Sequence, residues 1–209
     1  MRKSIIQRAA LSSVLLCVLY CSFVPYGHAG PTAPAPGTAA PETLQKPLIV
    51  YYSLTGTTRT IAKELASALS CETEELVSQK YRQYLWKITC VNDQLFDRDD
   101  DLANVKKDLT KYNQLIIASP VWIHTISSPM RTLIKYNGFK NKKVWLVLTN
   151  QGNYGPADET SIIKFLNDWG ITVKGCYNIC TTGKTEQELH QYARLIAQDI
   201  AKARNQNKD

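Results

Sequence analysis

Runs of apolar residues alternate with amphipathic stretches along most of the chain. A continuous apolar run such as Leu48-Ile49-Val50-Tyr51-Tyr52 is typical of a strand buried on both faces. The pattern predicts five strands, over residues 48–52, 72–77, 115–118, 144–148 and 171–180. Apolar positions at helical spacing predict four helices, over residues 57–69, 127–136, 157–169 and 185–204. This alternation indicates an α/β fold, with a doubly wound parallel sheet of five strands covered by helices on both faces.

Residues 78–112 fit this pattern least well. Apolar positions between Tyr81 and Val91 suggest a further helix, and the acidic run from Asp97 to Asp101 predicts a solvated loop.

The N-terminus has the composition of a targeting segment. Basic residues at positions 2 and 3 precede an uncharged run over residues 9–24, and Gly27-His28-Ala29 offers small residues at a cleavage site. We therefore expect residues 1–29 to be a cleaved signal peptide, 30–46 a Pro/Ala-rich linker and 47–209 the domain, in a periplasmic or secreted protein. The alternative is a retained membrane anchor, although the run is shorter than the ~20 residues that a spanning helix needs.

Composition and charge exclude several classes. A hydrophobic content of 44% allows a packed core. The whole chain has a net charge of +7, and removal of the basic residues Arg2, Lys3 and Arg8 with the leader leaves 22 basic against 18 acidic residues, a net charge of +4. This mild excess lacks the dense basic stripe of nucleic-acid-binding proteins. No cluster of His and Cys has metal-site spacing, and no catalytic triad is visible.

The turn after the first strand carries the clearest chemical signal. Its residues are Ser53, Leu54, Thr55, Gly56, Thr57 and Thr58. A helix N-terminus offers unsatisfied N–H groups and a positive local field to a phosphate, the hydroxyls add donors, and Gly56 allows a close approach. The alternative is an ordinary turn with a Thr cap. The turn is not a Walker loop, because no Gly-Lys-Ser/Thr follows.

The segment Tyr52-Ser-Leu-Thr-Gly-Thr-Thr-Arg-Thr-Ile-Ala62 resembles the FMN phosphate loop of flavodoxins, commonly Ser-x-Thr-Gly-Asn-Thr, and departs from it at Thr57. Tyr112-Asn-Gln-Leu-Ile-Ile-Ala-Ser-Pro-Val-Trp122 resembles the third strand of that family and the loop after it. The resemblance covers most of residues 47–204. It implies a flavodoxin-like sheet of order 2-1-3-4-5 and FMN as the cofactor, bound beyond the carboxyl ends of the strands.

The resemblance also assigns a second and a third loop to the flavin. In the second, between Ser119 and Ser127, the expected contacts are Pro120, Val121, Trp122, Ile123 and His124. Trp122 is placed to stack on the ring, its alternative being a core position. His124 could hydrogen-bond the flavin or a substrate, or be merely exposed. In the third, the expected contacts are Gln151, Gly152, Tyr154 and Gly155, with Tyr154 covering the other face of the ring or lying in a surface turn.

Three functions stay open at this point. The first is an FMN-binding redox protein that transfers electrons outside the cytoplasm. The second is an NAD(P)H-dependent quinone- or nitro-type oxidoreductase that uses FMN, favoured by the lack of a glycine between Ser119 and Ser128. The third is a binding module without flavin. Expected partners are a redox protein or a small-molecule electron acceptor, with no nucleic acid and with membrane contact only through a retained leader. Because the chain is net positive, we expect a less strongly reducing flavin than in acidic flavodoxins.

Four cysteines follow the leader. Cys176 and Cys180 lie roughly 13 Å apart on one predicted strand, beyond the reach of a disulfide. A disulfide between Cys71 and Cys90 stays open; the alternative is that all four cysteines are small buried residues, which we expect for Cys176 and Cys180.

Overall fold

The computed structural model describes residues 46–206, apart from 83–85, 104 and 153. All of these belong to a compact unit of residues 41–209. The expected signal peptide and nearly all of the expected linker lie outside the described residues. Among the described residues, no helix combines the length and the apolar character needed to cross a bilayer.

Five parallel strands form the central sheet, in the order β2-β1-β3-β5-β6. The strands are β1 (Leu48–Tyr52), β2 (Glu72–Leu76), β3 (Gln114–Trp122), β5 (Lys143–Asn150) and β6 (Thr172–Cys180). A short strand, β4 (Thr125–Ile126), pairs antiparallel with the end of β3. Apart from this added strand, the sheet has the predicted flavodoxin-like order 2-1-3-4-5, which confirms the fold class.

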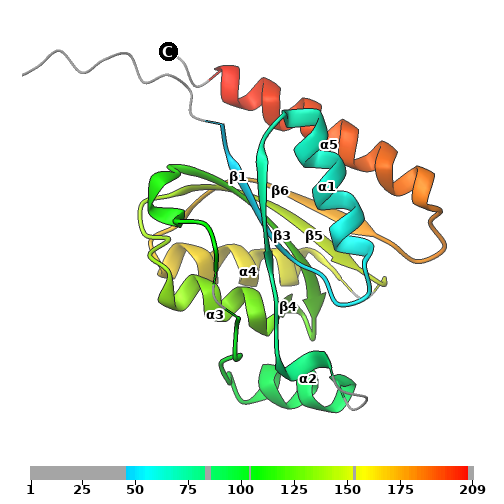
Figure 1. Ribbon diagram of the computed structural model, residues 1–209. Coiled ribbons are helices and arrows are strands. Elements are labelled where there is room, and N and C mark those ends of the chain that lie inside the picture. The colour runs from blue at the N-terminus through cyan, green and yellow to red at the C-terminus, as the bar shows by residue number, and fades with distance from the viewer. Residues whose placement is uncertain (1–45, 83–85, 104, 153, 207–209) are drawn as a thin grey trace, which may run out of the picture. The chain divides into compact units, whose positions relative to one another are not determined.

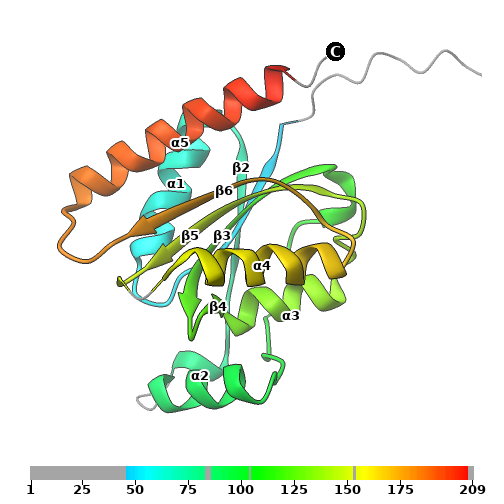
Figure 2. The same cartoon turned by 180° about the vertical axis from the view of Figure 1, so that it is seen from behind.

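Helices cover both faces of the sheet (Figures 1 and 2). One face carries α1 (Thr57–Leu69) and α5 (Glu186–Gln206), and the other carries α3 (Ser128–Tyr136) and α4 (Pro156–Asp168). Successive residues of β1 alternate between two hydrophobic clusters: Ile49 packs with α1 and α5, whereas Val50 packs with α3 and α4. Both clusters are built from residues at or after Leu48.

The segment between β2 and β3 contains the helix α2 (Trp86–Leu95), as the apolar spacing predicted, and two short 3₁₀ turns, Lys80–Arg82 and Leu109–Lys111. α2 contacts the start of α3 and β4: Arg131 Nη2 donates to Asp93 O at 3.2 Å, and Gln94 Nε2 donates to Ile126 O at 3.0 Å. In Figure 1, α2 lies beyond β4.

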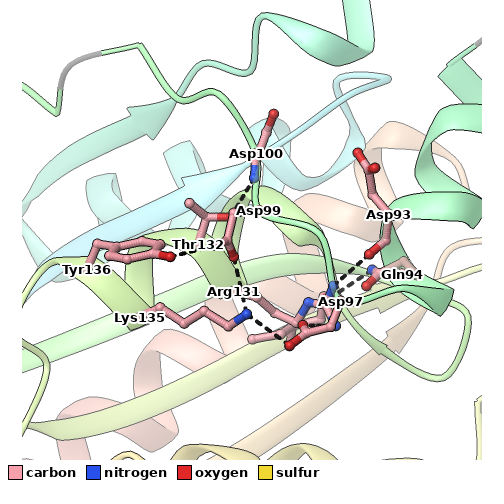
Figure 3. Close-up of polar contacts among 10 residues, drawn as sticks. Asp93, Gln94, Asp97, Asp99, Asp100, Arg131, Thr132, Lys135 and Tyr136 are labelled. Carbon is pink, nitrogen blue, oxygen red and sulfur yellow. Dashed lines mark hydrogen bonds and ion pairs between the residues drawn. The ribbon is translucent and has the colours of Figure 1, made fainter.

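The prediction of a solvated loop over Asp97 to Asp101 is wrong for its central part. Asp100 is buried: its Oδ1 accepts a hydrogen bond from Ser78 Oγ at 2.9 Å, and its N–H donates to Thr132 Oγ1 at 2.8 Å. Figure 3 shows Asp97 and Asp99 directed toward α3, where Lys135 Nζ contacts both carboxylates at 3.0 and 3.2 Å. Basic and hydroxyl groups on α3 therefore draw this acidic segment onto the domain.

The disulfide left open between Cys71 and Cys90 is not formed. Cys90 belongs to the cluster beneath α3 and α4, whereas Cys71 packs against the cluster beneath α1 and α5, on the opposite face of the sheet. Burial of all four thiols is also wrong, because Cys180 is exposed at the end of β6.

Candidate functional site

A cavity of about 440 Å³ opens where the carboxyl ends of β1, β3, β5 and β6 meet. Its lining residues are Leu54, Thr55, Thr57, Thr58, Pro120, Val121, Trp122, Ile123, His124, Thr149, Asn150, Gln151 and Thr181. None of these is an Asp, Glu, Lys or Arg. A bound anion would therefore depend on neutral donors and on helix dipoles rather than on a formal positive charge.

The turn after β1 brings the N-terminus of α1 to this cavity. Gly56 is the N-cap residue at φ +101°, a left-handed conformation that favours glycine. Its N–H donates to Ser53 Oγ at 3.2 Å, so the Ser53 hydroxyl closes the turn. No side chain caps α1 and no acidic residue stands in its first turn. The first N–H groups of α1, at Thr57 and Thr58, are thus available to a ligand, which is what a phosphate requires.

A buried hydroxyl pair holds this turn against β5. Thr58 Oγ1 and Thr149 Oγ1 lie 2.9 Å apart, and both residues are almost completely buried. Because the pair joins α1 to the end of β5, it fixes the position of the helix N-terminus relative to the rest of the cavity wall.

The second loop is shorter than the sequence predicted. The third strand continues to Trp122, and Val121 and Trp122 pair with Ile126 and Thr125 in a tight hairpin. The two turn residues, Ile123 and His124, both have positive φ, at 45° and 63°. Two positive φ angles are typical of type I′ hairpin turns, which prefer Asn and Gly, and a β-branched residue there is strained. Strain of this kind concentrates at functional sites.

Trp122 combines a packed position with a place in the cavity wall. Its ring meets Tyr52 and Tyr81 in edge-to-face contacts, with centroids 5.6 and 5.0 Å apart. It also lines the cavity. The two tyrosines therefore support the indole from behind, and stacking on a flavin stays a prediction.

His124 joins the second loop to the third. Its Nδ1 lies 3.0 Å from Asp158 Oδ1, while Asp158 Oδ2 accepts the Gly155 N–H at 2.8 Å. The Gly155 N–H, and after it His124, hold the pKa of Asp158 below its ordinary value. A carboxylate in the first turn of α4 thus ties the hairpin to the loop after β5.

Asn150 organises the third loop. Its Oδ1 accepts the Gly152 N–H at 2.8 Å, and its Nδ2 donates to Asn178 Oδ1 on β6. Its carbonyl oxygen accepts the N–H and the hydroxyl of Thr181, at 2.8 and 2.9 Å. Asn150 lines the cavity together with Thr149 and Thr181, and none of the three is among the predicted contacts. Their position just after the predicted strands was the feature of the sequence that could have identified them.

Ten of the fifteen predicted site residues line the main cavity. Ser53 and Gly56 shape the turn after β1, and Gly152 turns the third loop at φ +110°. Tyr154 and Gly155 lie elsewhere: they line a separate cavity of about 320 Å³ with Pro156 and Asn178. The side chain of Tyr154 packs against the hydrophobic cluster beneath α4, and its contact with a flavin ring stays a prediction.

Comparison with solved structures supports the fold. A flavoprotein from Lactobacillus acidophilus, crystallised in complex with FMN, is 25% identical, covers 64% of this chain and 92% of its own, and gives a TM-score of 0.50. Two proteins assigned as flavoproteins share the fold. That from Bacteroides uniformis is 21% identical (TM-score 0.56), covering 70% of this chain and 96% of its own. That from Bacteroides eggerthii is 20% identical (TM-score 0.54), covering 73% and 98%.

No curated protein matches the chain. The family described as NADPH-dependent FMN reductase matches residues 48–169, which span the first four strands of the parallel sheet and the three loops around the cavity. The chain is a member of the NADPH-dependent FMN reductase family, with a flavodoxin-like fold.

Proposed function

We propose that this protein binds FMN in the main cavity and transfers electrons between an NAD(P)H-class donor and an acceptor. The observation that carries the proposal is the uncapped N-terminus of α1, which opens onto a cavity without a single carboxylate in its lining. The family match and the FMN complex of the Lactobacillus acidophilus flavoprotein support the same cofactor.

The residues present fit such a ligand. The N–H groups of Thr57 and Thr58 and the hydroxyls of Thr55 and Thr57 would bind the phosphate. Trp122 and Ile123 would cover apolar parts of the ring, while Asn150 and Gln151 offer amide groups to its polar edge. FMN, when bound, supplies the redox chemistry. The protein's part is to position the ring, to exclude water from it and, through His124, to hold a proton-accepting nitrogen at the cavity wall.

Two-electron chemistry is favoured over one-electron transport by the hairpin. Its tip has no glycine, and Ile123 and His124 already occupy left-handed conformations. A peptide flip toward the ring during one-electron reduction, which glycine allows readily, would therefore fall to residues with a restricted backbone. A redox titration distinguishes the two functions: a single two-electron wave supports the oxidoreductase, and two well-separated one-electron waves support a carrier.

We place this activity outside the cytoplasm, on the basis of the leader-like residues 1–29. Cell fractionation of the full chain, alongside a chain lacking those residues, tests the location.

The binding experiment uses calorimetry with FMN, riboflavin and inorganic phosphate, and the variant Thr57→Glu. A glutamate at the first position of α1 is favourable for the helix but repels a phosphate. Because like charges brought together cost several kcal/mol, we expect FMN affinity to fall by about 100-fold or more, with riboflavin binding unchanged. Ser161→Glu, an equal change of charge on the exposed side of α4, is the matched control. Folded protein that takes up neither FMN nor riboflavin would refute the proposal.

A further inference from the structure

Lysines gather at the end of the sheet opposite the cavity. Lys46 precedes β1, Lys111 precedes β3, and Lys140 and Lys143 flank the start of β5. Lys107 reaches the first residue of β2, where its Nζ lies 2.9 Å from Glu72 Oε1. We call these five lysines, together with Trp169, the basic pole.

Hydrogen bonds join neighbouring turns within the basic pole. The Asn141 N–H donates to Gly170 O at 2.8 Å, and the Thr172 N–H to Lys142 O at 3.0 Å. On the other side, the Lys143 N–H donates to Asn113 O at 3.0 Å. The turns before β3, β5 and β6 are thereby held side by side.

Most of this charge is not neutralised within the domain. Lys46, Lys140 and Lys143 are exposed, and no ion pair involves them in the described part of the chain. Lys111 has Asp108 at 3.9 Å, with both side chains largely exposed. Only Lys107 has a close carboxylate partner. Exposed pairs of this kind contribute little, so the pole keeps a positive field.

An exposed aromatic residue lies within the same surface. Trp169 caps the C-terminal end of α4, is 42% exposed and sits directly before Gly170, whose Cα faces the aliphatic part of Lys140. A partly exposed indole suits the headgroup region of a membrane, where one end of the ring meets an apolar and the other a polar environment.

The domain is also joined to its N-terminal segment at this pole. Lys46 and Pro47 lead directly into β1, and Figure 1 shows the start of β1 beside the end of α5. The sequence before Lys46 holds the Pro/Ala-rich stretch 30–46 and the apolar run 9–24. If the chain is held at a membrane through its N-terminus, the basic pole is the end of the domain that lies nearest in sequence to the point of attachment.

We propose that the basic pole docks on an anionic phospholipid surface, with Trp169 at the level of the headgroups. The cavity lies at the opposite ends of the same strands, so docking leaves its mouth directed away from the lipid. The binding surface belongs to the folded domain, so docking does not require a retained leader and does not depend on the bound cofactor.

The test uses a chain beginning at Gly30, since both hydrophobic clusters are formed by residues from Leu48 onward. Its co-sedimentation is measured with phosphatidylcholine vesicles with and without phosphatidylglycerol. We expect binding only to the anionic vesicles, weakening as salt is added. Each basic residue near the membrane surface raises the vesicle partition constant about fivefold. The partition constant of the double variant Lys140→Glu, Lys143→Glu should therefore be lower by about 25-fold or more.

The matched control is Lys63→Glu with Arg98→Glu, which changes the net charge equally at exposed positions away from the pole and should bind as the wild type does. Trp169→Ala should weaken binding while keeping its salt dependence. Circular dichroism confirms that each variant is folded. The proposal is overturned if both double variants lose binding equally, if the wild type ignores anionic vesicles, or if heparin binds it more tightly than the vesicles do.

Discussion

The imidazole Nδ1 of His124, a residue of the cavity lining, lies 3.0 Å from the carboxylate of Asp158 in the first turn of α4. The same carboxylate accepts the N–H of Gly155, so one side chain spans the two loops that flank the proposed ring site. This contact makes the hairpin and the third loop a single unit.

Replacement of Asp158 should loosen both loops together. The pKa of Asp158 is held low in the folded state, chiefly by the Gly155 N–H. Its contribution to stability is therefore present above the unfolded pKa of about 3.9 and is lost as the pH falls through the lower folded value. We expect the difference in melting temperature between the wild type and Asp158→Asn to be largest near neutral pH. It should shrink in acid, as followed by calorimetry across the pH range. A difference that grows on acidification would contradict this account.

The strained hairpin predicts a stabilising substitution. Ile123 and His124 occupy positions where Asn and Gly carry little steric cost, whereas a left-handed conformation costs other residues roughly 1–2 kcal/mol. Ile123 is 41% exposed, so only part of its apolar burial offsets the relief of strain. Ile123→Asn, which leaves the His124–Asp158 contact in place, should raise the free energy of unfolding by up to about 1 kcal/mol in urea titrations. The matched variant Ile123→Ala should give no such gain, since alanine keeps the strain.

The Thr58–Thr149 pair should show strong coupling in a double-mutant cycle. Thr58→Val leaves the Thr149 hydroxyl buried without its partner, which costs about 1–3 kcal/mol. The double variant Thr58→Val, Thr149→Val removes both polar groups and should recover much of that loss. Urea unfolding of the four proteins measures the coupling. Strictly additive single effects would show that the two hydroxyls do not interact.

Asp100 should make the domain less stable as the pH rises. Burial raises its pKa, and only one of its carboxylate oxygens has a hydrogen-bond partner within the described residues. The stability linked to this raised pKa is complete below the unfolded value of about 3.9 and is lost as the pH climbs through the folded value. Asp100→Asn, compared with the wild type, should therefore be relatively more stable at pH 7 than at pH 4. If the stability difference between Asp100→Asn and the wild type were the same at pH 4 and pH 7, the pKa of Asp100 would not be raised by folding.

The sequence by itself determined the main strands, the helices and the turn that brings the N-terminus of α1 to the cavity. Buried parallel strands need continuous apolar runs. A run as short as residues 48–52, rich in β-branched and aromatic residues, favours a strand over a helix. The turn from Ser53 to Thr58 could be located because a phosphate site on a helix N-terminus is a local feature, made by consecutive residues.

Only the tertiary structure decided which side chains from distant segments contact one another. The burial of Asp100 depends on Ser78 and Thr132, and the hairpin at Ile123 depends on pairing with β4. The place of Tyr154 in the smaller cavity, rather than in the main one, depends on its packing against the cluster beneath α4. The His124–Asp158 contact and the basic pole have the same origin. Each joins residues far apart in sequence, and no periodicity or motif encodes which strand ends a fold will bring together.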